Sequence, residues 1–375
     1  IVNETLLKLL KLNVRLPDSF EGDLNAQLAA CEIGRRRISD LESRYSVKVL
    51  KNIFSDLLNR SELMTRRAIR ELPDGKHSYF DFLDNDGIDL DTPIKIEVSV
   101  LVEDDSVHID FQGTSGQVRG PFNLMPSGAY AAAYFAVHAM TDPDIPTNGG
   151  CFRPITLSLP PKSIINPEEP APVNARTSTM KRVAGCITSA LGQFVPDRAP
   201  ADSAGEMLLL AFGGERVDGS RYVVGELIAS GSGASEGMDG VDVIETDGTN
   251  CMNLPVEALE MDVPIRVHKT ELRTGSGGAG KFRGGLGLVR EYEILHGDVV
   301  FTHRGERHNY PAHGVLGGQS GGKAYSKIRR GNGTEEVIKS KVVDTLSQGD
   351  RIIVTTAGGG GYGAPELRLD SSIRN

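Results

Sequence analysis

Tryptophan is absent from the 375-residue chain, and cysteine is scarce. The four cysteines form no CxxC pair, which argues against a zinc knuckle or a disulfide framework and favours a reduced, cytoplasmic setting. Long apolar runs are missing too: residues 129–140 form the longest one, which contains His138 and falls short of the ~18 residues that a membrane span needs. No basic tract occurs and the net charge is −9, so we expect neither a membrane nor nucleic acid as a partner.

Glycine is scarce in the first part of the chain and abundant after it. Only four glycines lie in residues 1–110, whereas the other 40 lie in the remaining 265 residues. Charge divides in a similar way, because residues 1–76 carry a net charge of +3 and the rest of the chain carries −12. Apolar residues in 23–45 and 47–72 recur at the helical spacing of three and four. We therefore expect a helical segment at residues 1–76 and a second domain at residues 77–375.

The second domain shows the period of β-strands. Residues 94–102 alternate between apolar and polar, and residues 107–111 do so again after an acidic turn, which predicts an antiparallel meander. Two Ala-rich or Thr-rich stretches predict inserted helices at residues 127–140 and 177–194. Further short strands are expected at residues 222–228, 264–272, 288–295, 299–302 and 351–355. The predicted fold class is α+β, with an N-terminal helical segment before a largely antiparallel, β-rich body with inserted helices and Gly-rich turns.

One glycine-rich segment approaches a nucleotide-binding motif. Residues 275–281 (GSGGAGK) satisfy G-x-x-x-x-G-K, but Phe282 stands where a serine or threonine would bind magnesium. Two more glycines follow at once, so no helix is expected to offer its N-terminus to a phosphate. The pattern favours a structural glycine turn over an ATP site. The run GGGGYG at residues 358–363 allows either tight backbone packing or a close approach to a ligand. The sequence does not distinguish these two roles.

Two clusters have some features of a metal site. Four aspartates surround Gly87, but an EF-hand register would begin at Phe82 and end at Pro93, so a solvated acidic hairpin is favoured. His303 and His308 frame the segment HRGERH. A spacing of five places them on opposite faces of a strand and on different faces of a helix. Histidines that are hydrogen-bonded or exposed to solvent are therefore favoured over a metal site in this chain.

Eight short phrases occur in a fixed order along the chain. They are NVRLP at 13–17, GDLNAQ at 22–27, DFQGTS at 110–115, GPFN at 120–123, NGGCFR at 148–153, NLPVE at 253–257, SGGAGKFRGG at 276–285 and GGGGYG at 358–363. Each phrase alone is weak. In this order they resemble the hydantoinase B/oxoprolinase family, which includes the large subunit of ATP-dependent N-methylhydantoinases and is related to 5-oxoprolinase and the acetone carboxylase α subunit.

The resemblance implies that a larger enzyme is needed for catalysis. Family members carry a long additional segment before the matching part, and that segment supplies the Asp and His ligands of the catalytic divalent metal. This chain opens at Ile1 without such a segment, so we expect a fragment or one piece of a split subunit, with no cofactor of its own. Family members act beside a hydantoinase A-type subunit, which resembles an acetate kinase-like ATPase and phosphorylates the substrate carbonyl oxygen. ATP and Mg are therefore expected on that partner.

The activity that the resemblance implies is ATP-dependent hydrolysis of a cyclic amide of the hydantoin, oxoproline or lactam type. The chain would act in a hetero-oligomer and would be inactive alone. Two alternatives are a subunit of an ATP-dependent ketone carboxylase and a non-catalytic scaffold for assembly and substrate shaping. The residues do not distinguish hydantoin, oxoproline, lactam and ketone.

Three polar side chains within the family-like phrases are candidates for substrate binding, namely Asn123, Asn148 and Arg283. Each lies beside glycines that permit a tight turn, and each can orient a carbonyl or a phosphate through directional hydrogen bonds. The alternative is that the two asparagines satisfy the backbone of their turns and that Arg283 pairs with an acid such as Glu291.

Overall fold

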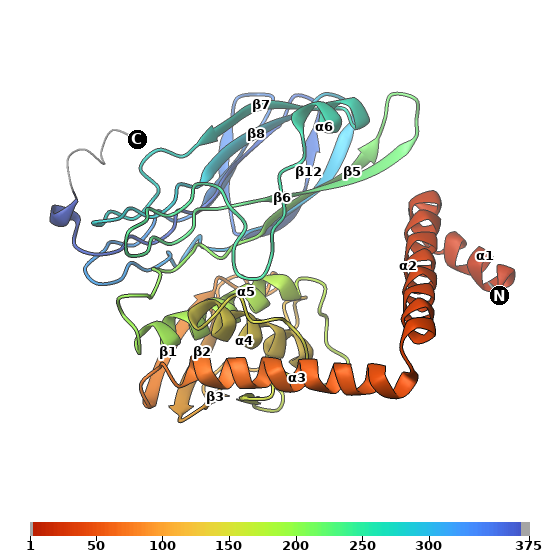
Figure 1. Ribbon diagram of the computed structural model, residues 1–375. Helices are drawn as coiled ribbons and strands as arrows, with labels where there is room; N and C mark the ends of the chain where they lie inside the picture. Colours follow the sequence, from red (N-terminus) through yellow and green to blue (C-terminus); the bar gives the residue numbers. More distant parts are fainter. Residues whose placement is uncertain (1–2, 369–375) are drawn as a thin grey trace. The chain divides into compact units, whose positions relative to one another are not determined.

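The computed structural model describes residues 3–368, which separate into two compact units (Figure 1). The first unit comprises residues 3–62 with Thr147–Gly150, and the second comprises Leu63–Pro146 and the described residues from Cys151 onward. Helices α1 (Glu4–Leu12) and α2 (Pro17–Arg44) belong to the first unit, and α3 (Val47–Ile69) runs from the first into the second. The division of the chain after residue 76 stays a prediction.

The second unit begins with a sheet that is covered by two helices. Its strands β2 (Ile94–Glu103) and β3 (Ser106–Asp110) form the predicted antiparallel meander. Strand β1 (Gly75–Leu83) extends the meander as an antiparallel neighbour of β2, and β4 (Ile155–Ser158) adds a parallel edge to β3. Every second residue of β2 is buried, as the alternation requires. Helices α4 (Pro126–Met140) and α5 (Arg176–Gly192) pack on that apolar face and close the first core.

Two more sheets enclose the second core and form a β-sandwich. One sheet has the order β11-β10-β13-β8-β7 and the other β12-β9-β5-β6, and all their pairs are antiparallel. The bounds are β5 (Leu208–Glu215), β6 (Arg221–Ile228), β7 (Ile265–Leu272), β8 (Leu288–Ile294), β9 (Asp298–Arg304), β10 (Tyr325–Arg329), β11 (Glu335–Ile338), β12 (Lys341–Ser347) and β13 (Arg351–Thr355), with the short helices α6 (Val256–Asp262) and η1 (Pro365–Leu367) outside the sheets.

The α+β class is confirmed, and the two inserted helices lie within two residues of their predicted bounds. Strands β1, β4, β5, β10, β11 and β12 were not predicted, because they are short or because glycines and charged residues interrupt their apolar alternation. In residues 3–368, no helix has the length and the apolar character to cross a membrane.

The acidic loop between β1 and β2 differs from the expected solvated hairpin. Asp84 is 2% exposed, and its carboxylate accepts hydrogen bonds from the backbone N–H groups of His308 and Asn309, both at 2.9 Å. Asp86 is also buried and accepts backbone N–H groups of its own loop and of Gly120. The expectation was wrong for Asp84 and Asp86, because backbone donors take the place of water around their carboxylates. The other two aspartates, Asp89 and Asp91, are exposed as expected.

Five irregular segments of the second unit meet in what we call the glycine bundle, made of residues 199–205, 230–241, 276–287, 312–322 and 357–363. Backbone hydrogen bonds join the segments, as in Gly359 N–H to Gly285 O at 3.0 Å and Gly361 N–H to Gln319 O at 2.9 Å. A Cβ atom on Gly359 would lie 1.9 Å from the carbonyl oxygen of Ser232. Residues 358–363 are buried, so tight backbone packing is the role that the structure gives to the terminal glycine run.

We predict that Gly359→Ala destabilises the second unit by about 3 kcal/mol or more, because the Cβ atom collides with backbone that has no room to move. The measurement is urea unfolding followed by circular dichroism. The control is Gly213→Ala on β5, whose Cβ would meet only ordinary contacts of 3.8 Å and more and should cost less than about 1 kcal/mol. Equal unfolding midpoints for the two variants would contradict the tight packing.

Candidate functional site

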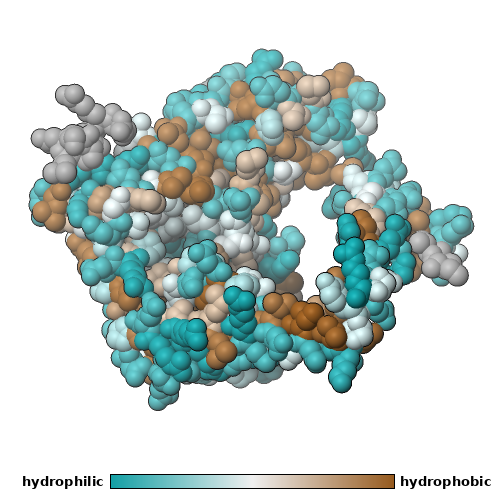
Figure 2. Space-filling model, in the orientation of Figure 1, coloured by the Kyte–Doolittle hydropathy of each residue, from teal (hydrophilic) through white to brown (hydrophobic). Residues whose placement is uncertain are grey.

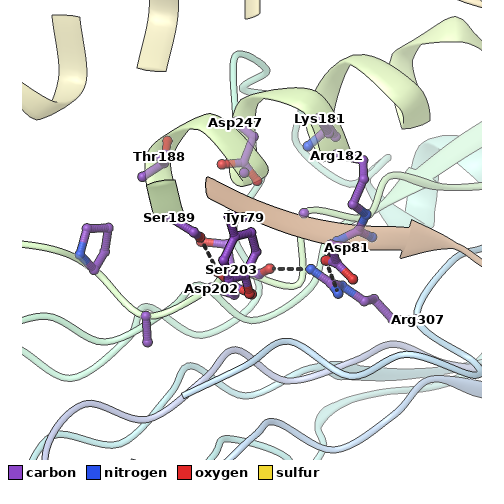
Figure 3. Close-up of a pocket in the computed structure, with 14 residues that line it drawn as sticks. Tyr79, Asp81, Lys181, Arg182, Thr188, Ser189, Asp202, Ser203, Asp247 and Arg307 are labelled. Carbon is purple, nitrogen blue, oxygen red and sulfur yellow. Dashed lines mark hydrogen bonds and ion pairs between the residues drawn. The ribbon is translucent and has the colours of Figure 1, made fainter. Parts of the chain in front are cut away.

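A small charged cavity lies where the helix-covered sheet meets the glycine bundle within the second unit (Figure 3). Its volume is about 30 Å³, which is enough for one water molecule but not for a substrate. Strand β1 contributes Tyr79 and Asp81, helix α5 contributes Lys181, Arg182 and Ser189, and irregular segments contribute Asp202, Ser203, Asp247 and Arg307. Alternate residues of β1 and residues on one face of α5 therefore direct acidic and basic side chains into the same cavity.

The centre of this cluster is Asp81, which binds two arginines. Its Oδ2 atom accepts hydrogen bonds from Nη1 of Arg182 at 2.7 Å and from Nη1 of Arg307 at 2.8 Å, and all three side chains are at most 4% exposed. Burial by itself would raise the pKa of Asp81, but the two guanidinium groups hold that pKa below its usual range. Within residues 3–368, Nε and Nη2 of Arg182 have no acceptor, so this arginine retains donor capacity toward the cavity.

A second carboxylate, Asp202, is shared between the cavity and the groove beside it. It accepts the hydroxyl of Tyr79 at 2.7 Å, the hydroxyl of Ser189 at 2.6 Å and the backbone N–H of His313 at 3.4 Å. Burial and the negative charge of Asp202 raise the pKa of Tyr79, so the phenol stays protonated and acts as a donor. A carboxylate offers about four acceptor positions, and Asp202 therefore keeps capacity for a ligand N–H.

Glu206 is a buried acid without a counterion at hydrogen-bond distance. It is 2% exposed, and neither of its carboxylate oxygens has a hydrogen-bond partner in the described part of the chain. Burial, together with the nearby charges of Asp84 and Glu306, raises its pKa well above the usual range for a glutamate. Burial therefore favours the protonated, neutral form of Glu206 in the folded protein.

The groove beside the cavity has a volume of about 860 Å³ and is largely apolar. Phe80 and Phe82 of β1 form one wall with Tyr310, whose ring stacks on Phe82 at a centroid distance of 4.6 Å. Leu316, 54% exposed, lies on the same groove. Apolar walls with a few convergent polar groups are typical of small-molecule sites, and this volume is within their usual range.

The structure places the three predicted substrate-binding residues away from the cavity and the groove. Asn123 is fully buried, and its amide bonds the backbone of Val118, Gly120 and Pro172. Asn148 lies in the first unit, where it donates to Ser61 and accepts from the N–H of Gly150. Substrate binding by these two asparagines stays a prediction.

Arg283 lies in the glycine bundle and pairs with a different acid from the one considered. It donates to Asp242 from Nη1 at 2.8 Å, whereas Glu291 pairs with Arg351 at 3.0 Å. Burial alone would raise the pKa of Asp242. The hydrogen bond and the positive charge of Arg283 outweigh that effect, so the pKa of Asp242 is lowered. A substrate role for Arg283 likewise stays a prediction.

The two histidines of HRGERH lie closer together than their spacing suggested. His303 is on β9, whereas His308 is in the loop after it, and the loop brings their ring centroids to 5.6 Å. Both ring nitrogens of His303 are hydrogen-bonded, and burial lowers its pKa to about 3. Within residues 3–368, no three His, Cys, Asp or Glu side chains are arranged to hold a metal ion.

The nucleotide-like segment also takes a structural position. In the described part of the chain, the element that follows Lys281 is strand β8 and not a helix, and the Lys281 ammonium pairs with Glu236 at 2.8 Å. Residues 276–287 belong to the glycine bundle, where their carbonyl and N–H groups are used by neighbouring backbone.

The candidates predicted from the sequence did not include Asp81, Arg182, Asp202 or Arg307. A usable signal existed for two of them: Asp81 occupies a buried position of an alternating strand, and Arg182 lies within the Ala-rich and Thr-rich stretch expected as a helix. Charged residues at positions that the pattern assigns to a core are paired with an opposite charge. The partner Arg307 comes from 226 residues away, and no local pattern identifies it.

The chain is an α+β protein with a helix-covered sheet, a β-sandwich and a glycine bundle built from irregular segments. Comparisons with known proteins show which family has this structure. The family model described as hydantoinase B/oxoprolinase matches residues 1–365. A putative D-/L-hydantoinase B subunit of Pseudomonas sp. (strain NS671) is 33% identical over all of this chain and 64% of its own length. The chain belongs to the hydantoinase B/oxoprolinase family.

Solved structures agree with the family. The crystal structure of ATP-dependent caprolactamase from Pseudomonas jessenii matches with a TM-score of 0.91 and 29% identity, over 99% of this chain and 66% of that one. Nucleotide-free acetone carboxylase matches with a TM-score of 0.89 and 16% identity, over 100% of this chain and 56% of that one, a likeness that shows the fold alone. The chain thus spans less than two thirds of the length of these relatives.

We predict that Glu206→Gln becomes progressively more stabilising, relative to the native protein, as pH rises above the usual pKa of a glutamate. The folded state keeps a proton on Glu206 that the unfolded state releases above the usual glutamate pKa, so native stability falls with rising pH. Each unit of raised pKa corresponds to about 1.4 kcal/mol. Urea unfolding at several pH values measures this, with Glu215→Gln at the exposed end of β5 as control. A pH-independent difference for Glu206→Gln would be the contrary result.

Proposed function

We propose that this chain is the part of a B-type subunit that shapes the substrate site of an ATP-dependent cyclic-amide hydrolase, acting with a hydantoinase A-type subunit. The match to ATP-dependent caprolactamase at a TM-score of 0.91 carries the proposal. The hydantoinase relative at 33% identity supports the same substrate class, a ring that contains an amide.

The groove is the surface on which we place the cyclic amide. Its aromatic wall of Phe80, Phe82 and Tyr310 offers flat apolar faces to a small ring. Asp202 has acceptor capacity for the ring N–H, and its own position is held by the hydroxyls of Tyr79 and Ser189. An amide N–H and an apolar ring match these two features of the groove.

The chain's own residues supply binding and orientation, and the remaining chemistry is assigned elsewhere. Because the described residues contain no set of three metal-ligating side chains, no step is assigned to a metal held by this chain. The proposal assigns ATP and Mg to the A-type partner. It assigns a divalent metal to the part of the relatives that this chain does not span. Phosphorylation of the amide oxygen there would turn a poor leaving group into a good one.

The proposal predicts that the chain, the remaining part of the B-type subunit and an A-type subunit together hydrolyse ATP in proportion to ring opening. Caprolactam, 5-oxoproline and hydantoin are the substrates to compare, with ADP and the ring-opened acid measured in the same reaction. Omission of the A-type subunit should abolish both products. ATP turnover that is indifferent to all three rings, or carboxylation of a ketone in their place, would contradict cyclic-amide hydrolysis.

A groove variant tests where the ring binds. We expect Leu316→Arg to lower kcat/KM by about tenfold or more through KM, because it places a long charged side chain in the apolar groove and leaves the core untouched. Val337→Arg on β11 is the matched control, since Val337 is 77% exposed and lies outside the groove. Both variants should melt like the native protein. If Leu316→Arg has the kcat/KM of the native protein, the substrate does not bind in this groove. That result would leave the proposed ATP-dependent hydrolysis itself intact, because the coupled assay tests it separately.

A further inference from the structure

Strand β1 has one free edge, and the groove follows that edge. β1 is the terminal strand of its sheet, so only the side that faces β2 is paired. Apolar surface alone does not identify a ligand, because apolar side chains also gather over helix α3 (Figure 2). The groove is different, since six consecutive residues of β1, 77–82, line it. Side chains alternate between the two faces of a strand, so consecutive lining residues indicate that the main chain of the edge faces the groove too.

The hydrogen bonds of β2 show which residue of β1 directs its main chain to this edge. Phe80 lies opposite Glu97. The N–H of Glu97 donates to Oγ1 of Thr114 at 3.0 Å, and its carbonyl oxygen accepts the Thr114 hydroxyl at 2.9 Å. Glu97 therefore directs both groups away from β1, which makes Phe80 and Glu97 a non-hydrogen-bonded pair of the ladder. The N–H and the carbonyl of Phe80 consequently point away from β2, toward the free edge.

Phe80 is the open position of this edge. Two residues earlier, the carbonyl oxygen of Ser78 accepts Nε2 of Gln193 at 2.9 Å. Two residues later, the N–H of Phe82 donates to Oδ1 of Asp81 at 2.7 Å. In the described part of the chain, no loop or side chain forms a hydrogen bond with the main chain of Phe80, and this residue is 52% exposed. The groove thus contains an unpaired donor and an unpaired acceptor side by side.

A cyclic amide is complementary to this donor and acceptor. The N–H and C=O of one strand residue point to the same side, and exposed sheet edges bind ligands through such pairs. Ring closure holds the amide of a five- to seven-membered lactam in the cis form, so its N–H and C=O also lie on one side. An open-chain secondary amide is trans, and its two groups point in opposite directions. Phe80 can therefore form two hydrogen bonds with a cyclic amide but only one with an open-chain amide.

Asp202 adds a second acceptor to the same groove. A lactam has one N–H group, so it can satisfy either Asp202 or the carbonyl of Phe80. A hydantoin ring has two N–H groups. One of them can reach Asp202 while the other, together with the carbonyl beside it, pairs with Phe80. A ring with two N–H groups therefore uses all three hydrogen-bonding groups of the groove.

We propose that the main chain of Phe80 recognises the cyclic amide: its N–H donates to a ring carbonyl oxygen, and its carbonyl accepts the ring N–H beside that oxygen. Asp202 accepts the second N–H of a hydantoin ring, which gives hydantoins an advantage over lactams. This inference rests on the proposed function, because it concerns the same groove and the same class of substrate. It adds a donor for the ring carbonyl oxygen and a physical basis for the choice of a cis amide.

Replacement of Phe80 by its α-hydroxy analogue, phenyllactate, tests the donor. Phenyllactate incorporated at an amber codon exchanges the N–H of residue 80 for an ester oxygen and keeps the aromatic ring. The variant is assayed in the complex of this chain with the remaining part of the B-type subunit and an A-type subunit. We expect kcat/KM for hydantoin to fall by about tenfold or more, because the ring carbonyl loses its donor.

Phenyllactate at position 82 is the matched control. Phe82 lies on the same strand and lines the same groove, but its N–H is already used by Asp81. In both variants the carbonyl that precedes the ester belongs to a residue that faces β2, so the loss to the β1–β2 ladder is matched. The control should keep a kcat/KM close to the native value, and both variants should melt at the same temperature. A native kcat/KM in the position-80 variant, or equal losses in the two variants, overturns the proposal.

A series of methylated hydantoins tests the two acceptors. 1-Methylhydantoin and 3-methylhydantoin each lack one N–H group, and each should have a kcat/KM about tenfold or more below that of hydantoin. 5-Methylhydantoin carries the same added bulk on carbon and keeps both N–H groups, so its kcat/KM should stay close to that of hydantoin. If only one of the two N-methyl compounds is affected, a single acceptor recognises the ring and the pairing with Phe80 is contradicted.

Failure of this inference can be distinguished from failure of the proposed function. If the complex opens no cyclic amide with ATP, the proposed function is wrong and this inference with it. If the complex opens these rings but the phenyllactate variant at position 80 keeps the native kcat/KM, ATP-dependent hydrolysis stands and only the recognition by Phe80 is wrong.

Discussion

Much of the second unit depends on the carboxylate of Asp81. It joins strand β1 to helix α5 through Arg182 and to the loop after β9 through Arg307. Arg307 extends the connection, because it also donates to the carbonyl oxygens of Ser203 and Ala204 in the glycine bundle. A buried charge that loses its partner is costly, so the helix-covered sheet, the sandwich and the bundle are held in one arrangement. The cavity and the groove take their shape from this arrangement.

The position of the groove explains how a site can be rigid and still open. Its aromatic wall stands on β1, which is held by nine paired positions with β2, and its polar end is fixed by the hydroxyls around Asp202. The opposite side is formed by residues 313–316 of the glycine bundle, whose backbone is bonded to neighbouring segments. Side chains on regular strands and locked backbone keep a binding geometry with little loss of freedom on binding.

Local patterns predicted the parts of the fold that local physics determines. Alternation gave β2 and β3, and helical spacing gave α4 and α5 close to their observed bounds. The site could not be predicted in the same way, because Asp81 and Arg307 are 226 residues apart and become neighbours only through the topology. The expectation for the acidic loop was wrong for a related reason, since the donors that bury Asp84 come from residues 308 and 309. Glycine content indicated a special backbone, but not that its segments would pack on one another.

The glycine bundle also affects how stability depends on temperature. Unfolding exposes peptide groups there in place of the aliphatic side chains that fill an ordinary core. Exposed apolar surface raises the heat capacity of unfolding, whereas exposed polar surface lowers it. The second unit should therefore have a smaller heat-capacity change per residue than a sandwich packed by side chains alone. Its free energy of unfolding then varies along a flatter curve and declines more gradually on both the warm and the cold side of its maximum.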